Sequence, residues 1–343
     1  MTKLHPALQT PLLKTLGCEL PILLAGMGGV ARHELAAAVS RAGGFGVLGM
    51  VREPVELIRA EIAALRRATD KRFAVNLIPA ATDAALLKAQ VNACLALQVP
   101  AMVLFWEVDT PLVRHLKEEG VQVIHQVGNQ KDADNALAAG ADVLIVQGHE
   151  AGGHVRGTTS IFSLLPQIAS QSPVPVVASG GIGNGRALVA ALALGAQGVS
   201  LGTALLATNE ANAHDYHKQR VLQANADDTI YTTRFNRNWH EAAPVRVLGN
   251  DVLAGRYDNA ERDTVIGQQD NQPVYLFSTD SPLKGAIGNI EDMAIYCGQS
   301  CGQIHQQYSA GERIVRILLE AQETLRKFDG SSSGHEYDLT QAV

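Results

Sequence analysis

Short apolar runs alternate with amphipathic segments along the first two hundred residues of the chain. The runs show no helical spacing, which is typical of strands buried on both faces of a parallel sheet. They span residues 21–26, 45–50, 73–78, 101–108, 121–127, 143–148, 175–179 and 198–203. The segments between them have helical spacing, as at Leu35, Ala38, Val39 and Ala42. Eight strand-and-helix units in strict alternation predict an α/β fold, a closed (β/α)8 barrel rather than a doubly wound sheet.

The regular alternation stops after Thr203. Residues 227–284 are rich in Asn, Asp, Arg, Gln and Pro and have no clear period, which predicts a lobe or extended loops over the active face of the barrel. Residues 291–299 and 311–328 are predicted helices, and the second is amphipathic, so we expect it to pack on the barrel or on a second subunit of a homodimer. The predicted divisions are a barrel at 1–204, an inserted lobe at 205–290, C-terminal helices at 291–328 and a polar tail at 329–343.

Composition narrows the choice of partners. The 343 residues are 46% hydrophobic and carry a formal net charge of −6, with no run of Lys and Arg, so nucleic acid and anionic membranes are not expected as partners. No stretch reaches the ~18 apolar residues of a membrane span, and the four cysteines are scattered, as in a reduced protein. We therefore expect a cytoplasmic enzyme that acts on a small molecule.

Two glycine-containing loops follow the last two predicted strands. One is the run GGIGNG at 180–185, and the other contains Gly202 and Thr203. In a (β/α)8 barrel these neighbouring loops form the usual phosphate site, because free backbone N–H groups at a helix N-terminus attract an anion. The alternative is that both loops are only tight turns. We predict a phosphate site.

The sixth predicted strand ends in the polar loop GHEAGGH, residues 148–154. His149, Glu150 and His154 resemble the zinc motif H-E-x-x-H, but the spacing is one residue too long and two glycines would break the required helix, so no metal is expected. His154 is the predicted general base or hydrogen-bond donor, because an imidazole titrates near neutral pH. The alternative is a surface histidine that binds nothing. His125, on the fifth strand, is the second catalytic candidate, and its side chain points either into the barrel mouth or outward.

Amide side chains end two of the strands. Asn76 follows the third strand and Gln147 the sixth, and each could bind the edge of a flat heteroaromatic ring. Polar residues are common at strand ends, so this observation alone is weak. Phe105 and Trp106 could form the wall of an apolar pocket or could belong to the core.

The chain resembles the nitronate monooxygenases, formerly called 2-nitropropane dioxygenases, over nearly the whole barrel and again near the C-terminus. The matching segments are PILLAGMGGVARHELAAAVSRAGGFGVLG, FAVNL, VQGHEAGGHVRG, VASGGIGNGRALVAALALGAQGVSLGTALLATNE, DDTIYTTRFNRNWHEAAPVRVLGN and YCGQSCGQI. The resemblance implies a TIM barrel that binds FMN non-covalently beneath an inserted lobe.

The resemblance also implies roles for individual residues. The loop histidine of the family matches His154, and a base used by some members matches His125. The implied cofactor-binding residues are Ala25, Gly26, Met27, Asn76, Gln147, Gly152, Gly153, Ser179, Gly180, Gly181, Ser200, Leu201, Gly202 and Thr203. Among them, 25–27 would lie against the isoalloxazine, whereas Gly181 and 200–203 would surround the phosphate.

The implied reaction is oxidation of an alkyl nitronate, and in some cases a nitroalkane, by O2 to a carbonyl compound and nitrite. The same barrel occurs in NAD(P)H-dependent quinone reductases and enoyl-thioester reductases, which remain the alternative. GFGVLG at 44–49 fits the dinucleotide fingerprint by letter, but a helix precedes it and a strand contains it, so it is not an independent nicotinamide signal. A flavin-binding protein without turnover is the remaining possibility.

Overall fold

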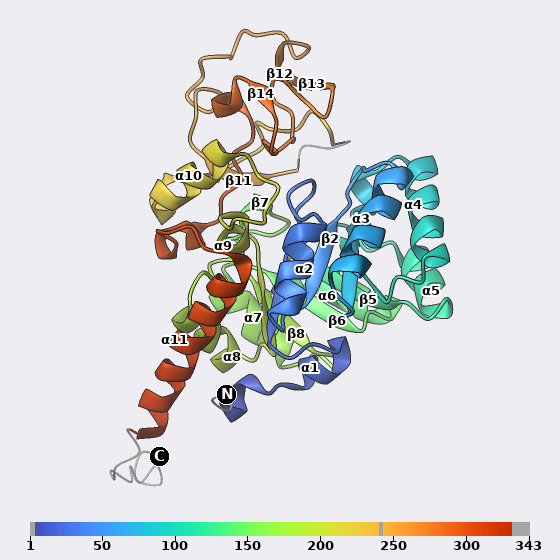
Figure 1. Ribbon diagram of the computed structural model, residues 1–343, viewed down its shortest axis with the longest axis vertical. Coiled ribbons are helices and arrows are strands. Elements are labelled where there is room, and N and C mark those ends of the chain that lie inside the picture. The colour runs from blue at the N-terminus through green and yellow to red at the C-terminus, as the bar shows by residue number, and fades with distance from the viewer. Residues whose placement is uncertain (1–3, 240–242, 331–343) are drawn as a thin grey trace.

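Eight parallel strands close into a barrel at the centre of the molecule (Figure 1). The computed structural model describes residues 4–239 and 243–330, so the predicted polar tail beyond 330 lies outside the described residues. The strands follow the order β1-β9-β8-β6-β5-β4-β3-β2. They are β1 (Ile22–Leu24), β2 (Gly46–Gly49), β3 (Phe73–Leu77), β4 (Ala101–Phe105), β5 (Gln122–Val127), β6 (Val143–Gln147), β8 (Val176–Ser179) and β9 (Gly198–Leu201). The predicted (β/α)8 barrel is confirmed.

The barrel closes between its first two strands. Leu23 and Phe45 form a parallel bridge, Leu24 N donates to Phe45 O at 3.0 Å, and Phe45 N donates to Ile22 O at 2.9 Å. On its other side β1 pairs with β9. The three residues of β1 therefore connect the two ends of the strand series.

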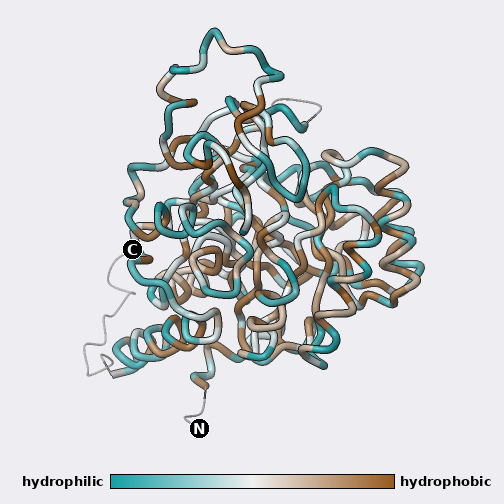
Figure 2. The backbone as a smooth tube through the Cα atoms, turned by 45° about the horizontal axis from the view of Figure 1, so that its top comes forward, coloured by the Kyte–Doolittle hydropathy of each residue, from teal (hydrophilic) through white to brown (hydrophobic). Residues whose placement is uncertain are grey.

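Helices cover the outside of the barrel, and apolar residues concentrate between them and the strands (Figure 2). They are α2 (His33–Arg41), α3 (Val55–Ala68), α4 (Ala84–Ala96), α5 (Thr110–Glu118), α6 (Gln130–Ala139), α7 (Ile161–Ala169), α8 (Gly185–Ala193) and the short α9 (Thr203–Leu206). Three smaller elements complete this part, namely η1 (Pro6–Leu8), α1 (Pro11–Leu16) and η2 (Pro79–Ala81). No helix in the described ranges is long and apolar enough to cross a membrane.

Residues after α9 form a lobe above the carboxyl ends of the strands (Figure 1). It has its own apolar core around Phe235, Val252 and Leu276. Its elements are α10 (Asp215–Gln223), η3 (Ala226–Asp228), β10 (Thr229–Thr232), β11 (Val245–Leu248), β12 (Val265–Gln269), β13 (Gln272–Tyr275), β14 (Ile287–Gly288), η4 (Ile290–Asp292) and η5 (Gln299–Gln303). The sheet of β10 and β11 also contains β7 (Gly153–His154), which belongs to the loop after β6. The lobe and the barrel therefore share a sheet.

The helix predicted at 291–299 is wrong. The chain makes one turn at η4 and then runs extended against the barrel and the lobe. Leu248 N donates to Ile295 O at 2.9 Å, and Gln299 N donates to Glu150 O at 2.9 Å. Tertiary backbone pairing therefore outweighs the helical pattern of this short segment.

The last helix, α11 (Ala310–Gly330), packs on α8 and α2. Its buried face contains Ile314, Ile317, Leu318 and Ala321. A Cβ on Gly185, the first residue of α8, would lie 2.4 Å from Ile317 O and 2.3 Å from Ala321 N. Glycine is therefore required where the two helices touch.

Two histidines are completely buried in the structure. His125 lies on β5, and His217 lies on α10, where its Nε2 donates to the carbonyl of Tyr296 at 2.8 Å. Burial lowers the pKa of each imidazole to about 4, from 6.5. Both side chains are therefore neutral in the folded protein at pH 7.

Replacing Ile317 by Ala should lower the free energy of unfolding by about 2–4 kcal/mol, because it leaves a cavity between α11 and α8. The control is Leu319→Ala on the same helix, where the side chain is 58% exposed and the expected change is within about 0.5 kcal/mol. Urea unfolding measures both. Equal effects would contradict this packing.

Stability should fall as the pH decreases from about 6.5 towards 4. In this window the unfolded chain binds protons at His125 and His217, whereas the folded chain does not, so each histidine contributes a slope of about 1.4 kcal/mol per pH unit. Urea midpoints between pH 7 and 5 measure this slope. His217→Gln should make it shallower, and an unchanged slope would show that His217 is not held neutral.

Candidate active site

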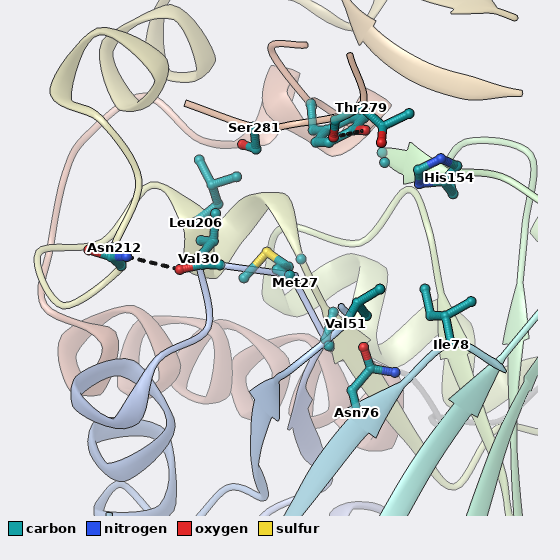
Figure 3. Close-up of a pocket in the computed structure, with 18 of the residues that line it drawn as sticks. Met27, Val30, Val51, Asn76, Ile78, His154, Leu206, Asn212, Thr279 and Ser281 are labelled. Atoms are coloured by element: carbon teal, nitrogen blue, oxygen red, sulfur yellow. Dashed lines mark hydrogen bonds between the residues drawn. The ribbon is translucent and has the colours of Figure 1, made fainter. Parts of the chain in front are cut away.

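A cavity of about 940 Å³ lies between the carboxyl ends of the strands and the lobe (Figure 3). Its barrel wall comes from the loops after β1, β2, β3, β6, β8 and β9. Its other wall comes from the lobe, including Thr279 and Ser281, which lie across from Met27 and Asn76 in Figure 3. This is the rim at which parallel barrels place their reactive groups.

The structure brings nearly all the predicted cofactor residues to this one cavity. Those that line it are Ala25, Gly26, Met27, Asn76, Gln147, Gly152, Gly153, Ser179, Gly180, Gly181, Ser200, Gly202 and Thr203. Leu201 does not line it, because its side chain belongs to the barrel core. Only its backbone, next to Gly202, is near the cavity.

The predicted phosphate corner has free backbone donors. Within the described residues, the N–H groups of Gly181, Ile182 and Gly202 donate to no protein acceptor. A Cβ on Gly202 would be 3.7 Å from Ala25 and 3.9 Å from Met27, so it would enter the cavity. These groups suit an anion.

The N-terminus of α8 does not face this corner. Asn184 caps it by accepting from Ala187 N at 2.9 Å, and Gly185 N donates to the carboxylate of Glu320 at 2.9 Å. The glycine run therefore contributes the N–H groups of Gly181 and Ile182 to the predicted phosphate corner. The helix start exposed to the cavity is that of α9, at Gly202 and Thr203.

Two buried polar atoms at the cavity have no partner among the described residues. Asn76 donates its Nδ2 to Val103 O at 3.0 Å, which leaves its Oδ1 without a hydrogen bond, and Ser200 Oγ also has none. A Cβ on Gly26 would lie 2.3 Å from Asn76 Cγ, so glycine is required for Asn76 to occupy this place. Both atoms are therefore available to a ligand in this cavity.

Gln147 lines the cavity, and its amide also binds the loop that follows β6. Its Nε2 donates to His154 O at 2.9 Å, and its Oε1 accepts from Arg156 N at 3.1 Å. Both ends of the amide are thus bound to the loop that follows β6. Gln147 therefore fixes the shape of this loop.

His154 lines the cavity, and its ring is surrounded by aromatic groups. Trp239 stacks on it with 3.9 Å between ring centroids, and Trp106 and Tyr296 lie at 6.2 and 6.0 Å. Its Nε2 is buried without a partner in the described chain. Burial, together with a smaller effect of the positive charge of Arg52, lowers the pKa of His154 to about 3. The ring is thus neutral at pH 7, although one side of it borders the cavity.

His125 lies away from the cavity. The side chains of a strand alternate between its two faces, and Gln126 is the residue of β5 that lines the cavity. The Nδ1 of His125 instead lies 3.0 Å from the carbonyl of Gln126. His125 therefore cannot reach a ligand in this cavity.

Sequence reasoning missed Arg52, Trp239 and Tyr296, which lie around His154. Arg52 has a left-handed backbone with φ +60°, and its side chain donates to Asn238 O at 3.0 Å and pairs with Asp280 at 3.5 Å. Tyr296 lies in the segment YCGQSCGQI that carries the family resemblance, which was a usable signal. Trp239 lies in another matching segment, DDTIYTTRFNRNWHEAAPVRVLGN, so the same signal was present for it.

The predicted absence of the H-E-x-x-H helix agrees with the local geometry. His149 packs edge-on against Tyr231, and Glu150 accepts from the backbone of Ile161 at the start of α7. Within the described chain, no cluster of three or more His, Cys, Asp or Glu side chains could hold a metal ion. The cavity instead suits a flat heteroaromatic ring that carries a phosphate.

Comparison with known proteins identifies a family for most of the chain. Residues 9–320 match the family described as nitronate monooxygenase. The chain is 37% identical, over 92% of its length and 96% of the relative, to a (3aS,4S,5R,7aS)-5-hydroxy-7a-methyl-1-oxo-octahydro-1H-indene-4-carboxyl-CoA dehydrogenase of Mycobacterium tuberculosis. It is 30% identical, over 93% of its length and 99% of the relative, to a probable nitronate monooxygenase of Staphylococcus saprophyticus.

Among solved structures, FabK from Thermotoga maritima superposes with a TM-score of 0.80 at 30% identity, covering 94% of this chain and 99% of that one. The family match spans the barrel, the lobe and most of α11. The chain therefore belongs to the nitronate monooxygenase family and is a flavin-dependent oxidoreductase.

Proposed function

We propose that the chain binds FMN in this cavity and oxidises alkyl nitronates with O2 to carbonyl compounds and nitrite. When bound, the flavin supplies the electron transfer between substrate and O2. The residues present fit this cofactor. The N–H groups of Gly181, Ile182 and Gly202 would bind the phosphate, while Asn76 Oδ1 and Ser200 Oγ would accept from or donate to polar edges of the flavin.

Glu150 lies near the proposed phosphate position, because a Cβ on Gly181 would lie 3.5 Å from Glu150 Cβ. Its two oxygens are occupied by Ser160 and Ile161 at the N-terminus of α7. That interaction holds the negative charge at a positive helix end. The carboxylate is therefore compatible with an anion nearby.

The low pKa of His154 is the observation that favours nitronates over neutral nitroalkanes. A general base works best when its pKa is near the working pH, and an imidazole with a pKa of about 3 takes a proton from carbon poorly. A nitronate is already an anion and needs no base. Neutral His154 can then orient it by a hydrogen bond, and Arg52 provides a positive charge nearby.

The size of the cavity favours a second candidate, oxidation or reduction of an acyl thioester. The volume of about 940 Å³ is near the upper limit for sites that hold drug-sized ligands. Its lining extends beyond the proposed flavin-binding residues to Arg32, His33, Asp270 and Gln272. One similar protein is named a CoA dehydrogenase, which acts on such a bulky substrate.

Cofactor binding is tested by adding a side chain at Gly202. Gly202→Val should raise the Kd for FMN at least about tenfold, because its methyl groups would occupy the phosphate corner. Gly311→Val is the control, since nothing lies within 4 Å of a Cβ there. Fluorescence titration of apoprotein with FMN measures both. A wild-type protein that stays colourless in excess FMN would contradict the proposal.

The reaction is tested by O2 consumption. Ethylnitronate should be turned over at a rate independent of pH between about 5 and 8, because His154 stays neutral, and nitroethane much more slowly. His154→Gln should lower kcat/KM about tenfold, the value of one hydrogen bond. A loss of about a hundredfold or more would show that His154 transfers a proton.

The same flavin-loaded protein distinguishes the nitronate reaction from the second candidate, the thioester reaction. Under anaerobic conditions, ethylnitronate should bleach the flavin and NADH or NADPH should not. Rapid bleaching by a reduced nicotinamide or by an acyl-CoA, without bleaching by the nitronate, would replace the nitronate reaction with the thioester reaction.

A further inference from the structure

The loop that carries His154 is held by the lobe. Strand β11 pairs antiparallel with β7, so that Val245 lies opposite His154 and Arg246 lies opposite Gly153. Gly153 has a left-handed backbone, with φ +78°, and nothing lies within 4 Å of a Cβ built on it. The loop itself therefore restricts its backbone little at this point. Pairing with β11 provides the missing restraint.

Arg246 adds a second restraint to the same loop. It is only 3% exposed, and its Nε and Nη2 both donate to the carbonyl of His149, at 3.1 and 2.9 Å. Its Nη1 donates to Thr229 Oγ1 at 3.2 Å, and its guanidinium lies over the ring of Tyr231. The planar fork is thus fixed from three sides. Arg246 is thus a buried arginine whose guanidinium binds a backbone carbonyl of the loop that carries His154.

The positive charge of Arg246 is balanced by a carboxylate in the loop that carries His154. Burial lowers the pKa of its guanidinium, and the carboxylate of Glu150 is the largest opposing influence. The carboxylate of Glu150 in turn accepts a hydrogen bond of 3.0 Å from Ile161 N, at the start of α7. The lobe, the loop and α7 are therefore connected through adjacent residues of the loop, His149 and Glu150.

We propose that Arg246 is a positioning residue that holds His154 against Trp239 and so keeps its imidazole shielded from water and neutral. Arg246 fixes the start of the loop through its hydrogen bonds to the carbonyl of His149, and the β11–β7 pairing fixes the end of the loop at His154. Lysine cannot replace this function fully, because an ammonium does not have the planar fork. The inference rests on the proposed function only where turnover is measured.

Other groups around His154 define what its titration can report. Arg52 is the charged group that lowers its pKa, and Asp280 pairs with Arg52. Tyr296 borders the ring, and burial raises the pKa of its phenol far above neutral pH. Arg156 reaches the region only through the face of Trp106. Burial keeps the phenol of Tyr296 protonated between about pH 5 and 8, so Tyr296 adds no transition in this window.

The two tryptophans of the chain provide a readout that does not need turnover. Both Trp106 and Trp239 contact His154. A protonated imidazole quenches indole fluorescence, so tryptophan emission follows the charge of His154. In the flavin-loaded wild-type protein we expect constant emission between about pH 5 and 8.

Arg246→Lys and Arg246→Met should each introduce a fluorescence transition in this window, larger for Met, because water reaches the released imidazole. The transition should disappear in the Arg246→Lys, His154→Gln double variant. Flavin content should be unchanged. The kcat and kcat/KM for ethylnitronate should fall severalfold for Lys and more for Met, up to the loss of about tenfold expected for His154→Gln, because Arg246 acts through His154. Thr229→Val serves as a second variant if Arg246→Met does not fold. It removes one hydrogen-bond acceptor of the guanidinium and should give a weaker fluorescence transition.

Arg256→Gln is the matched control, because Arg256 is a lobe arginine in an exposed ion pair with Asp251. It should behave as the wild type in every measurement. A wild-type transition between pH 5 and 8 would overturn the inference. So would flat emission together with wild-type kcat in Arg246→Lys and Thr229→Val. Failure of nitronate turnover with the expected fluorescence would overturn the proposed reaction and leave the positioning role of Arg246 supported.

Discussion

Closure of the barrel at β1 is the constraint on which the site depends. This strand has only three residues, yet it pairs with β9 on one side and meets Phe45 on the other. The chain leaves β1 directly into Ala25, Gly26 and Met27, which line the cavity. Because closure brings β1 beside β9, this turn lies next to Gly202 and Thr203. Residues nearly two hundred positions apart in sequence thus form one corner.

The environment of His154 decides what chemistry the site can perform. An imidazole in water would change charge near neutral pH. Here indole and phenol rings enclose it, and an arginine nearby also disfavours its charged form. A neutral imidazole would suit the proposed substrate, which arrives already deprotonated. The lobe supplies Trp239, Tyr296 and the strand opposite His154, so it sets the reactivity of a barrel residue.

Much of the barrel could be predicted from sequence, because buried parallel strands and their helices have distinct periods. Asn76 and the glycine loops could be placed for the same reason, since strand ends meet at one rim. The sequence did not show which side chains of β5 point towards the cavity. A shift of one residue places Gln126 there in place of His125. Trp239 and Arg246 depend on how the lobe folds back, and that contact has no local pattern. The segment 291–299 failed because long-range backbone pairing determined its conformation.

The contact between Glu320 and the start of α8 has a consequence for shortened forms of the chain. The carboxylate on α11 occupies the electropositive end of a helix that begins four residues after Gly181. Through this contact the C-terminal helix supplies an internal counter-anion beside the phosphate corner. Without α11 the N–H of Gly185 would be left as a free donor, and the sides of α8 and α2 that α11 covers would be exposed, so a shortened form would lose packing together with this counter-charge.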